Sequence, residues 1–158
     1  NIMLLGCGLW MGTGVLVMAN SNVHVFGNQI GNHGSTNILV VGYQLDFTDK
    51  DYKPLPGDVV VRNNRHGRAG FAPGPQFAGG DQLKAALGTL PQIIWDGTGN
   101  GIIVRDKASA ITLGLTDPKQ RKTGGNPAPL VAGDPRTTVV PSEPARIVLP
   151  AAMEAAIR

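Results

Sequence analysis

Short apolar runs separated by Asn, Gly and Ser dominate the first third of the chain. Val15–Val17 and Val23–Phe26 are two such runs, and a shorter one surrounds Ile30. Each is too short for an ordinary helix, and the β-branched residues in them favour strands. The Asn and Gly residues between the runs accept positive φ angles at low energetic cost and therefore suit tight corners. The pattern predicts three short β-strands, joined by corners, within residues 14–30.

The same apolar pattern returns further along the chain at a constant spacing. Val15 aligns with Ile38 and Val17 aligns with Val40, so both positions advance by 23 residues. A repeat of this length is typical of solenoids whose coils each contain three short strands. We therefore expect a second coil to begin at residue 37.

A polar insertion interrupts this second coil. Val23 and Val25 align with Val59 and Val61 at an offset of 36 residues, which exceeds the 23-residue repeat by 13. Segment 43–56, which is rich in Asp, Lys and Pro, accounts for the excess. Insertions of this kind usually project from one face of a solenoid and often carry its binding surface.

Stacked coils would explain these features together. Coils about 4.8 Å apart satisfy each other's backbone hydrogen bonds, and alternate side chains fill a narrow core of Val, Ile and Leu. Asn28 would then lie over Asn64 and form a side-chain ladder with it. The alternative is a β-sandwich with Asn-Gly hairpins, which would have longer strands and no recurring offset. The sequence predicts an all-β fold, namely a fragment of a parallel β-helix, or solenoid.

The rest of the chain is expected to cap and cover the coils. Residues 81–88 have the N-terminal Asp, the apolar spacing and the final Gly of a short helix. Apolar segments at 90–97, 101–106 and 110–113 would pack beside the last coil, because an open solenoid end needs a cap. The predicted organisation is coils in 1–65 with an inserted loop at 43–56, a capping segment in 66–116, and an extended Pro- and Gly-rich tail in 117–158 with a short helix at its C-terminus.

Charge is distributed unevenly along the chain. The 158 residues include 14 Lys and Arg and 11 Asp and Glu, a net charge of +3, yet no charged residue precedes Asp46. The basic residues that follow are scattered and are not interleaved with aromatic residues, unlike those of a nucleic-acid-binding face. We therefore expect no nucleic-acid partner. We also expect no cofactor, because the Gly-rich stretches lack the strand, Lys and helix of a phosphate loop.

The uncharged N-terminal segment raises the question of a membrane anchor. Residues 2–19 lack charge over 18 positions, the lower limit for a membrane-spanning helix. Gly residues interrupt the segment but are tolerated in bilayers. What argues against a span is that the uncharged stretch continues far past the thickness of a bilayer, through Asn20, Asn22, Asn28, Asn32 and Asn37. Cys7 follows Leu-Leu-Gly as in a bacterial lipoprotein cleavage box, but no basic segment precedes it, so a buried hydrophobic role is expected. Because the chain starts at Asn1 without an initiator Met, we expect a processed or partial polypeptide.

Candidate binding residues lie in the inserted loop and on the strand that follows it. The loop acids lack the Gly and the distal Glu of an EF-hand, so solvated carboxylates are expected rather than a calcium site, and no metal is expected elsewhere. Cys7 is the only cysteine, which excludes an intrachain disulfide and a Cys-based zinc site. His66 stands beside Arg65 and could contact an anion. The candidate residues are Asp46, Asp49, Asp51, Asp58, Arg62, Arg65 and His66.

Two further side chains have structural interpretations. His24 alternates with Val23 and Val25, which are expected to point inward, so it should be an outward-facing, exposed polar residue. Trp95 is expected to pack within the cap rather than to serve as a platform for a sugar ring.

These segments, together with Leu90-Pro91-Gln92-Ile93-Ile94-Trp95-Asp96-Gly97, resemble the C-terminal part of secreted bacterial right-handed parallel β-helix repeat proteins. In that family an acid stands where this chain has Gln92. The resemblance covers residues 14–115 and implies a right-handed coil. It also implies a periplasmic, outer-surface or extracellular location, a second secreted protein as partner, and export by a signal or lipoprotein peptide, which leaves room for a lipid anchor on the precursor. It carries no catalytic residue over to this chain.

Three functions are consistent with this interpretation. The first is a β-helix module of an exported protein that presents a binding face to a polysaccharide or protein partner. The second is a carbohydrate-active enzyme of the lyase, hydrolase or epimerase type, with part of its site on N-terminal coils outside this chain. The third is a subunit of a larger exported assembly. No catalytic constellation in the sequence decides whether the protein is an enzyme.

Overall fold

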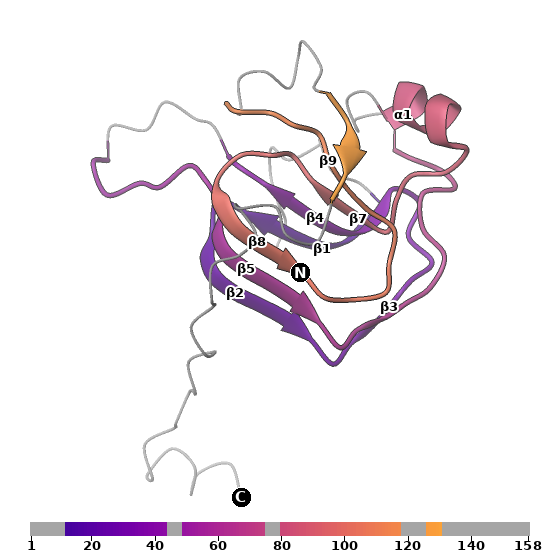
Figure 1. The fold of residues 1–158 in the computed structure, drawn as a ribbon, viewed down its shortest axis with the longest axis horizontal. Coiled ribbons are helices and arrows are strands. Elements are labelled where there is room, and N and C mark those ends of the chain that lie inside the picture. The colour runs from indigo at the N-terminus through magenta and orange to yellow at the C-terminus, as the bar shows by residue number, and fades with distance from the viewer. Residues whose placement is uncertain (1–11, 44–48, 75–79, 118–125, 131–158) are drawn as a thin grey trace, which may run out of the picture.

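The computed structural model describes residues 12–43, 49–74, 80–117 and 126–130. Within them the chain consists mostly of β-strands, with one short helix and no closed barrel, which confirms the expected all-β class (Figure 1). The strands form three sheets, here called A, B and C.

Sheet A is the largest of the three and is parallel except at one edge. Val15 pairs with Ile38 and Val17 pairs with Val40, so the predicted 23-residue register is confirmed. The final strand of the sheet is antiparallel to its neighbour. The strand order is β1 (Thr13–Met18), β4 (Thr36–Val41), β7 (Ile93–Trp95), β9 (Ala110–Thr112) and β10 (Ala128–Pro129).

Sheets B and C are parallel throughout. Val23 pairs with Val59 and Val25 pairs with Val61, which confirms the offset of 36 residues across the insertion. Sheet B consists of β2 (Ser21–Phe26), β5 (Gly57–Arg62) and β8 (Asn100–Val104). Sheet C consists of β3 (Gln29–Ile30) and β6 (Arg65–His66).

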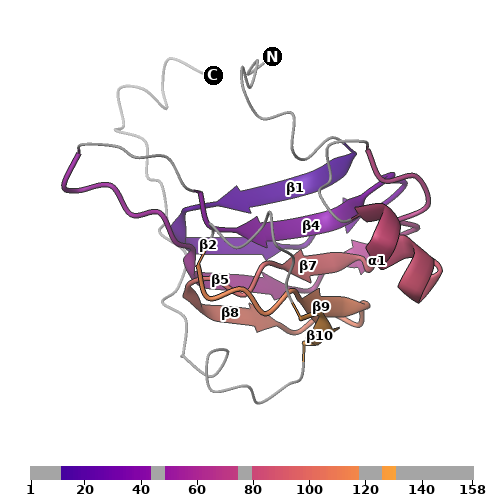
Figure 2. The same ribbon diagram turned by 90° about the horizontal axis from the view of Figure 1, so that it is seen from above.

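The chain visits the three sheets in a constant order. A first round runs through β1, β2 and β3, a second through β4, β5 and β6, and a third through β7 and β8 before β9 returns to sheet A. Seen from above, strands of successive rounds lie next to one another (Figure 2). The segment expected to cap the coils therefore continues sheets A and B. The pairing of β7 and β8 with earlier strands does not follow the offsets of 23 and 36 residues, because the 26 residues 67–92 lie between β6 and β7.

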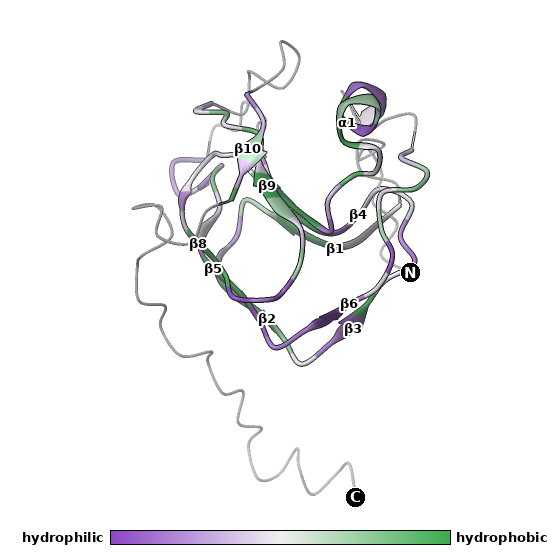
Figure 3. Ribbon diagram, turned by 45° about the vertical axis from the view of Figure 1, so that its right-hand side comes forward, coloured by the Kyte–Doolittle hydropathy of each residue, from purple (hydrophilic) through white to green (hydrophobic). Residues whose placement is uncertain are grey.

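Two apolar cores explain why β4 and β7, the inner strands of sheet A, are buried on both faces. Ile38 and Val40 of β4 pack with Trp95 in the core between the three sheets, whereas Leu39 and Val41 belong to a second cluster. Figure 3 shows hydrophobic colouring along β1, β4 and β9 of sheet A. All six residues of β4 are buried. Strands buried on both faces are typical of parallel sheets, and their sequences are continuous apolar runs. Trp95 is fully buried, as expected, but in the central core and not in a cap.

The single helix of the described residues packs beside the outer core. It was predicted over residues 81–88, and α1 spans Gly80–Leu87. Gly88 follows it with a φ of +82°, the left-handed conformation that commonly ends a helix. Leu83 packs against the outer apolar cluster, and the Lys84 ammonium donates to the Phe71 carbonyl at 2.8 Å.

Other predictions meet the structure only in part. His24 is half-buried instead of exposed, and neither of its ring nitrogens has a hydrogen-bond partner in the described residues.

In the inserted loop, the Tyr52 hydroxyl donates to the Tyr43 carbonyl at 2.7 Å. Among the described residues, no helix is both long and apolar enough to cross a bilayer. Cys7, most of the tail and the expected C-terminal helix lie outside the described residues.

Candidate functional site

A groove runs over the outside of sheet C. It has a volume of about 640 Å³ and is lined by residues 29–32 of the first round and 65–68 of the second. Gly31 and Gly67 are stacked so closely that a Cβ atom on Gly31 would lie 2.7 Å from the Cα of Gly67. The two glycines therefore leave bare backbone in the groove, with longer side chains on both sides of it.

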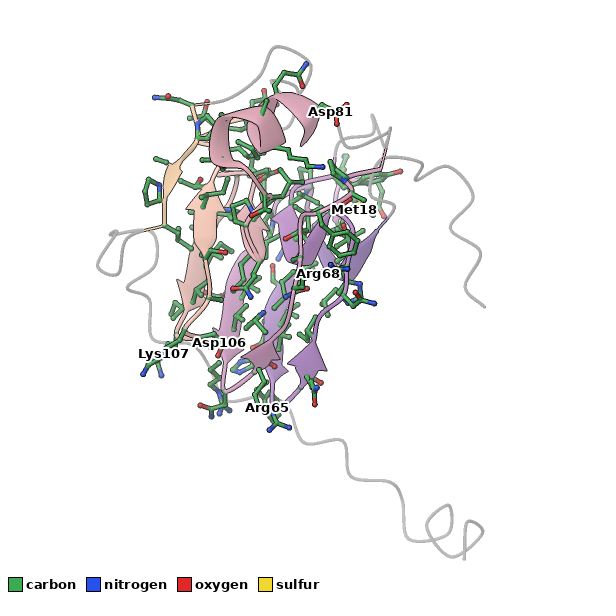
Figure 4. The ribbon with its side chains drawn as sticks, turned by 90° about the vertical axis from the view of Figure 1, so that its right-hand side faces the viewer. Met18, Arg65, Arg68, Asp81, Asp106 and Lys107 are labelled. Atoms are coloured by element: carbon green, nitrogen blue, oxygen red, sulfur yellow. The ribbon has the colours of Figure 1, made fainter. Side chains whose placement is uncertain are left out.

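Each side of the groove pairs an arginine with an amide from the neighbouring round. On one side the Arg65 Nη2 donates to the Gln29 Oε1 at 3.4 Å. On the other side the Arg68 Nη2 donates to the Asn32 Oδ1, also at 3.4 Å, and its guanidinium stacks 3.9 Å from the centre of the Phe71 ring. Both arginines are exposed, and Figure 4 shows them on the same face of the molecule. The groove is therefore bordered by two positive charges.

Within the part of the chain that the structure describes, no carboxylate neutralises these arginines. The single ion pair between described residues is His66–Asp106, so neither Arg65 nor Arg68 has an acidic partner in this part of the chain. A guanidinium carries five N–H donors, and one hydrogen bond from each leaves most of them for a ligand. Arg62 and Arg105 extend the positive surface past the corner, because the Arg105 backbone N donates to the Val61 carbonyl and so brings it beside Arg62. Arg62 also lies 4.7 Å from the centre of the exposed Phe26 ring.

A polar ladder supports the corner next to the groove. The Asn28 backbone N and Nδ2 both donate to the Asn64 Oδ1 at 3.0 Å, which confirms the predicted stacking of these residues. Asn64 in turn donates from Nδ2 to the Asp106 Oδ2 at 2.8 Å and from its backbone N to the Asp106 Oδ1 at 3.1 Å. The ladder therefore extends through three rounds, and its third member, Asp106, was not predicted.

The side chain of His66, predicted as an anion contact, is buried against Asp106, although His66 is among the residues that line the groove. Its Nε2 lies 2.9 Å from the Asp106 Oδ2, and both side chains are only 1% exposed. Its Nδ1 lies 3.5 Å from the Nδ2 of Asn37, whose amide also donates to the Gly67 carbonyl at 3.2 Å. That carbonyl fixes the orientation of the Asn37 amide, whose NH₂ group therefore faces the His66 Nδ1. His66 lines the groove, but its side chain is almost fully buried.

The surroundings of Asp106 favour its ionised form. Burial of the carboxyl group opposes ionisation, but the hydrogen bonds from His66 and from the side chain and backbone of Asn64, with the charge of His66, outweigh it. The pKa of Asp106 is therefore lower than its ordinary value of 3.8. An ionised carboxylate accepts all three hydrogen bonds without a proton of its own.

The predicted acidic residues lie away from the groove. Asp49 and Asp51 are exposed and form a local turn, in which the Asp51 backbone N donates to the Asp49 Oδ1 at 2.9 Å. Asp58 is half-buried near the start of β5, at the opposite end of that strand from Arg62, with a φ of +51°. Asp46 lies outside the described residues. No cluster of His, Cys, Asp or Glu suitable for a metal ion occurs in the described parts of the chain.

Of the predicted residues that the structure describes, Arg65 and His66 line the groove, and Arg62 stands at the end of the preceding strand, β5. Sequence reasoning missed the remaining groove side chains, Gln29, Asn32 and Arg68. The offset of 36 residues that aligned the valines also aligns Gln29 with Arg65 and Asn32 with Arg68. That signal could have found both sides of the groove.

The chain was also compared with known proteins. No family model, curated protein or solved structure matches it.

Proposed function

We propose that this chain is a right-handed parallel β-helix module of an exported protein, and that it binds an acidic polysaccharide in the groove on sheet C. The parallel pairing of all three sheets and the constant order in which the chain visits them support the β-helix. The resemblance of its repeats to secreted β-helix proteins supports export.

The observation that carries the binding proposal is a pair of guanidinium groups, on opposite sides of a groove with glycine backbone at its centre, that have no acidic partner among the described residues. Guanidinium groups bind carboxylates through two parallel hydrogen bonds, so Arg65 and Arg68 are suited to the carboxylates of a uronate polymer. The Gln29 and Asn32 amides next to them can bind sugar hydroxyls. Bare backbone at Gly31 and Gly67 allows a sugar ring to approach closely.

The course of the groove suggests how a polymer would lie. Each side of the groove consists of residues stacked from one round to the next, Gln29 over Arg65 and Asn32 over Arg68. A chain lying between them would cross successive coils and run along the axis of the solenoid. Its carboxylates would then meet one arginine on each side.

Binding without catalysis fits the groove better than a lyase or hydrolase site. The His66 ring and the Asp106 carboxylate are turned into the interior, where they contact each other and polar side chains. A general base must come within hydrogen-bond reach of the proton it removes. These two groups could contact a ligand in the groove only after a rearrangement of the corner that the Asn28, Asn64 and Asp106 ladder supports.

Binding to three polymers of different charge tests the proposal. We expect affinity for polygalacturonate and for dextran sulfate, none for neutral dextran, and weaker binding at higher salt because exposed charges are screened. The double variant Arg65→Gln/Arg68→Gln should lower the affinity at least tenfold, since each lost charge-assisted hydrogen bond is worth about 1.5–3 kcal/mol. Isothermal titration calorimetry gives the affinities.

The matched control is Lys50→Gln/Lys53→Gln, which removes two exposed charges from the inserted loop. It should bind like the unaltered protein. An equal loss in the control would mean that net charge, and not the groove, causes binding. Failure of the unaltered protein to bind either acidic polymer would contradict the proposed function.

A further inference from the structure

Arg65 is held between two residues that are both anchored to the same carboxylate. Asn64 precedes it and donates to Asp106 from both its backbone N and its Nδ2, at 3.1 and 2.8 Å. His66 follows it, and the His66 Nε2 lies 2.9 Å from the Asp106 Oδ2. The carboxylate belongs to the third round of the chain, whereas the two residues it holds, Asn64 and His66, belong to the second.

This arrangement fixes the direction of the Arg65 side chain. In an extended segment, neighbouring side chains point to opposite faces. Because the His66 side chain is locked inside against Asp106, Arg65 must point outward, where it meets Gln29. Arg65 is further restrained by its backbone N, which donates to the Asn28 carbonyl at 2.8 Å.

Arg68 on the opposite side of the groove is held by different contacts. Its carbonyl accepts a hydrogen bond from the Asn32 backbone N at 2.7 Å, and its guanidinium stacks on Phe71. None of the hydrogen bonds to Asp106 reaches Arg68 or its two neighbours in the chain. The two arginines therefore depend on separate supports.

We propose that Asp106 is a positioning residue for the groove, and that it presents Arg65 to the polyanion by holding Asn64 and His66 on either side of it. The inference rests on the proposed function, because it assigns a support to one of the two arginines expected to bind the polymer. Asp106 itself stays buried and touches no ligand.

The conservative variant Asp106→Asn removes this support with little change in size. An Asn side chain has one oxygen acceptor where the carboxylate has two, so its NH₂ group would face one of the present donors, Asn64 or His66. We expect the residues around Arg65 to loosen and the affinity for dextran sulfate to fall about tenfold, to the level of Arg65→Gln. Dextran sulfate is the probe because its sulfate groups stay ionised throughout the accessible pH range.

A pair of double-mutant cycles separates positioning from a general loss of structure. Adding Arg65→Gln to Asp106→Asn should cause no further loss, because both changes remove the same contact. Adding Arg68→Gln should lower the affinity by its full separate effect. Additive losses in the first cycle, or binding by Asp106→Asn equal to that of the unaltered protein, would overturn the inference while leaving the proposed function intact.

The NMR signals of the arginine Nε–H groups provide a second readout. On addition of dextran sulfate, the unaltered protein should show shifts for both Arg65 and Arg68, whereas Asp106→Asn should show a shift only for Arg68. Loss of both shifts would overturn the specific link to Arg65. Absence of both shifts in the unaltered protein, with no calorimetric signal, would instead refute the proposed function on which the inference rests.

Two further variants complete the design. Asp81→Asn removes an exposed carboxylate in the first turn of α1 and should leave affinity unchanged. If Asp106→Asn does not fold, His66→Gln removes the anchor on the other side of Arg65 and can replace it in both cycles. The same pattern of losses is expected, and additivity with Arg65→Gln would again overturn the inference.

Discussion

At the scale of single residues, the groove depends on the close approach of Gly31 and Gly67, and Gly31 is the more restrictive position because a Cβ atom on Gly67 would lie 3.3 Å from the Gly31 Cα. A Cβ atom on Gly31 would lie 2.7 Å from the Gly67 Cα and 3.0 Å from the Gly67 backbone N. These neighbours are backbone atoms of the adjacent strand and cannot move aside as the end of a flexible side chain can. The close contact lets sheet C form while leaving room between Arg65 and Arg68.

We expect Gly31→Ala to lower the free energy of unfolding by about 2 kcal/mol, because overpacking of this kind usually costs about 1–3 kcal/mol. It should also weaken binding of polygalacturonate, since the added methyl group separates the two rounds that line the groove. Urea unfolding and calorimetry measure the two effects. Gly57→Ala is the control, because its new Cβ would meet mainly the Ser21 hydroxyl, at 3.3 Å, and should cost less than 1 kcal/mol. Equal losses in the two variants would contradict the argument.

At the scale of elements, sheet C ends after two strands because the third round takes a shorter path. The chain goes from β8 to β9 through residues 105–109 and forms no partner for β6. Side chains instead of a third strand supply hydrogen bonds at this edge. The Gly67 carbonyl accepts them from the Gln92 Nε2 at 2.9 Å and from the Asn37 Nδ2 at 3.2 Å. Gln92 also accepts a hydrogen bond from the Ser109 backbone N at 3.1 Å. One amide side chain thus connects the second round to the third.

Gln92→Glu should therefore destabilise the protein. The carboxylate keeps the acceptor for the Ser109 backbone N but loses the donor to Gly67, and it places negative charge beside a carbonyl oxygen. We expect a loss of about 1–2 kcal/mol at neutral pH, in the range for an interrupted hydrogen bond. The loss should be smaller below the pKa of the new carboxyl group, where it can donate. Thermal unfolding at pH 7 and at pH 4 measures the loss of stability at neutral pH and its reduction in acid.

The control for this change is Gln82→Glu on the exposed face of α1, which introduces the same charge where no hydrogen bond depends on it. It should alter stability by less than 0.5 kcal/mol, as surface substitutions usually do. A Gln92→Glu protein as stable as this control would show that Asn37 alone satisfies the Gly67 carbonyl.

At the scale of the whole molecule, rounds of chain are held together by two apolar cores and by one polar ladder at a corner. The cores lie inside the three sheets and outside sheet A, and their contacts are not affected by pH. The ladder ends on Asp106, whose carboxylate joins the end of sheet B to sheet C through Asn64 and His66. Its ionisation is therefore coupled to the folding of the molecule.

Stability should decrease in acid through Asp106. Its pKa is lowered in the folded protein, so its contribution is fully present above the ordinary value of 3.8 and is lost as the pH falls through the lower folded value. Urea unfolding of the unaltered protein and of Asp106→Asn at a series of pH values measures this contribution as a difference. The two curves should lie furthest apart above pH 3.8 and converge below it. A constant gap between them would contradict the assignment, and Asp81→Asn should follow the unaltered protein throughout.

The apolar positions of the chain were sufficient to predict the strand register between the first two rounds. The offsets of 23 and 36 residues appear in the pairing of Val15 with Ile38 and of Val23 with Val59, because parallel strands buried on both faces require apolar residues at each rung. Asn28 and Asn64 followed from the same alignment. Register in stacked strands is a property of sequence spacing and can be read without coordinates.

The groove and its support depended on tertiary structure. Asp106 lies 42 residues beyond Asn64, an interval that matches neither predicted offset, because residues 67–92 change the length of the third round. His66 and Arg65 look equally suited to an anion in sequence, and only the burial of the Asp106 carboxylate decides that one points inward and the other outward. Spacing along the chain determines which backbones pair, whereas the direction of a polar side chain depends on the partner that folding brings to it.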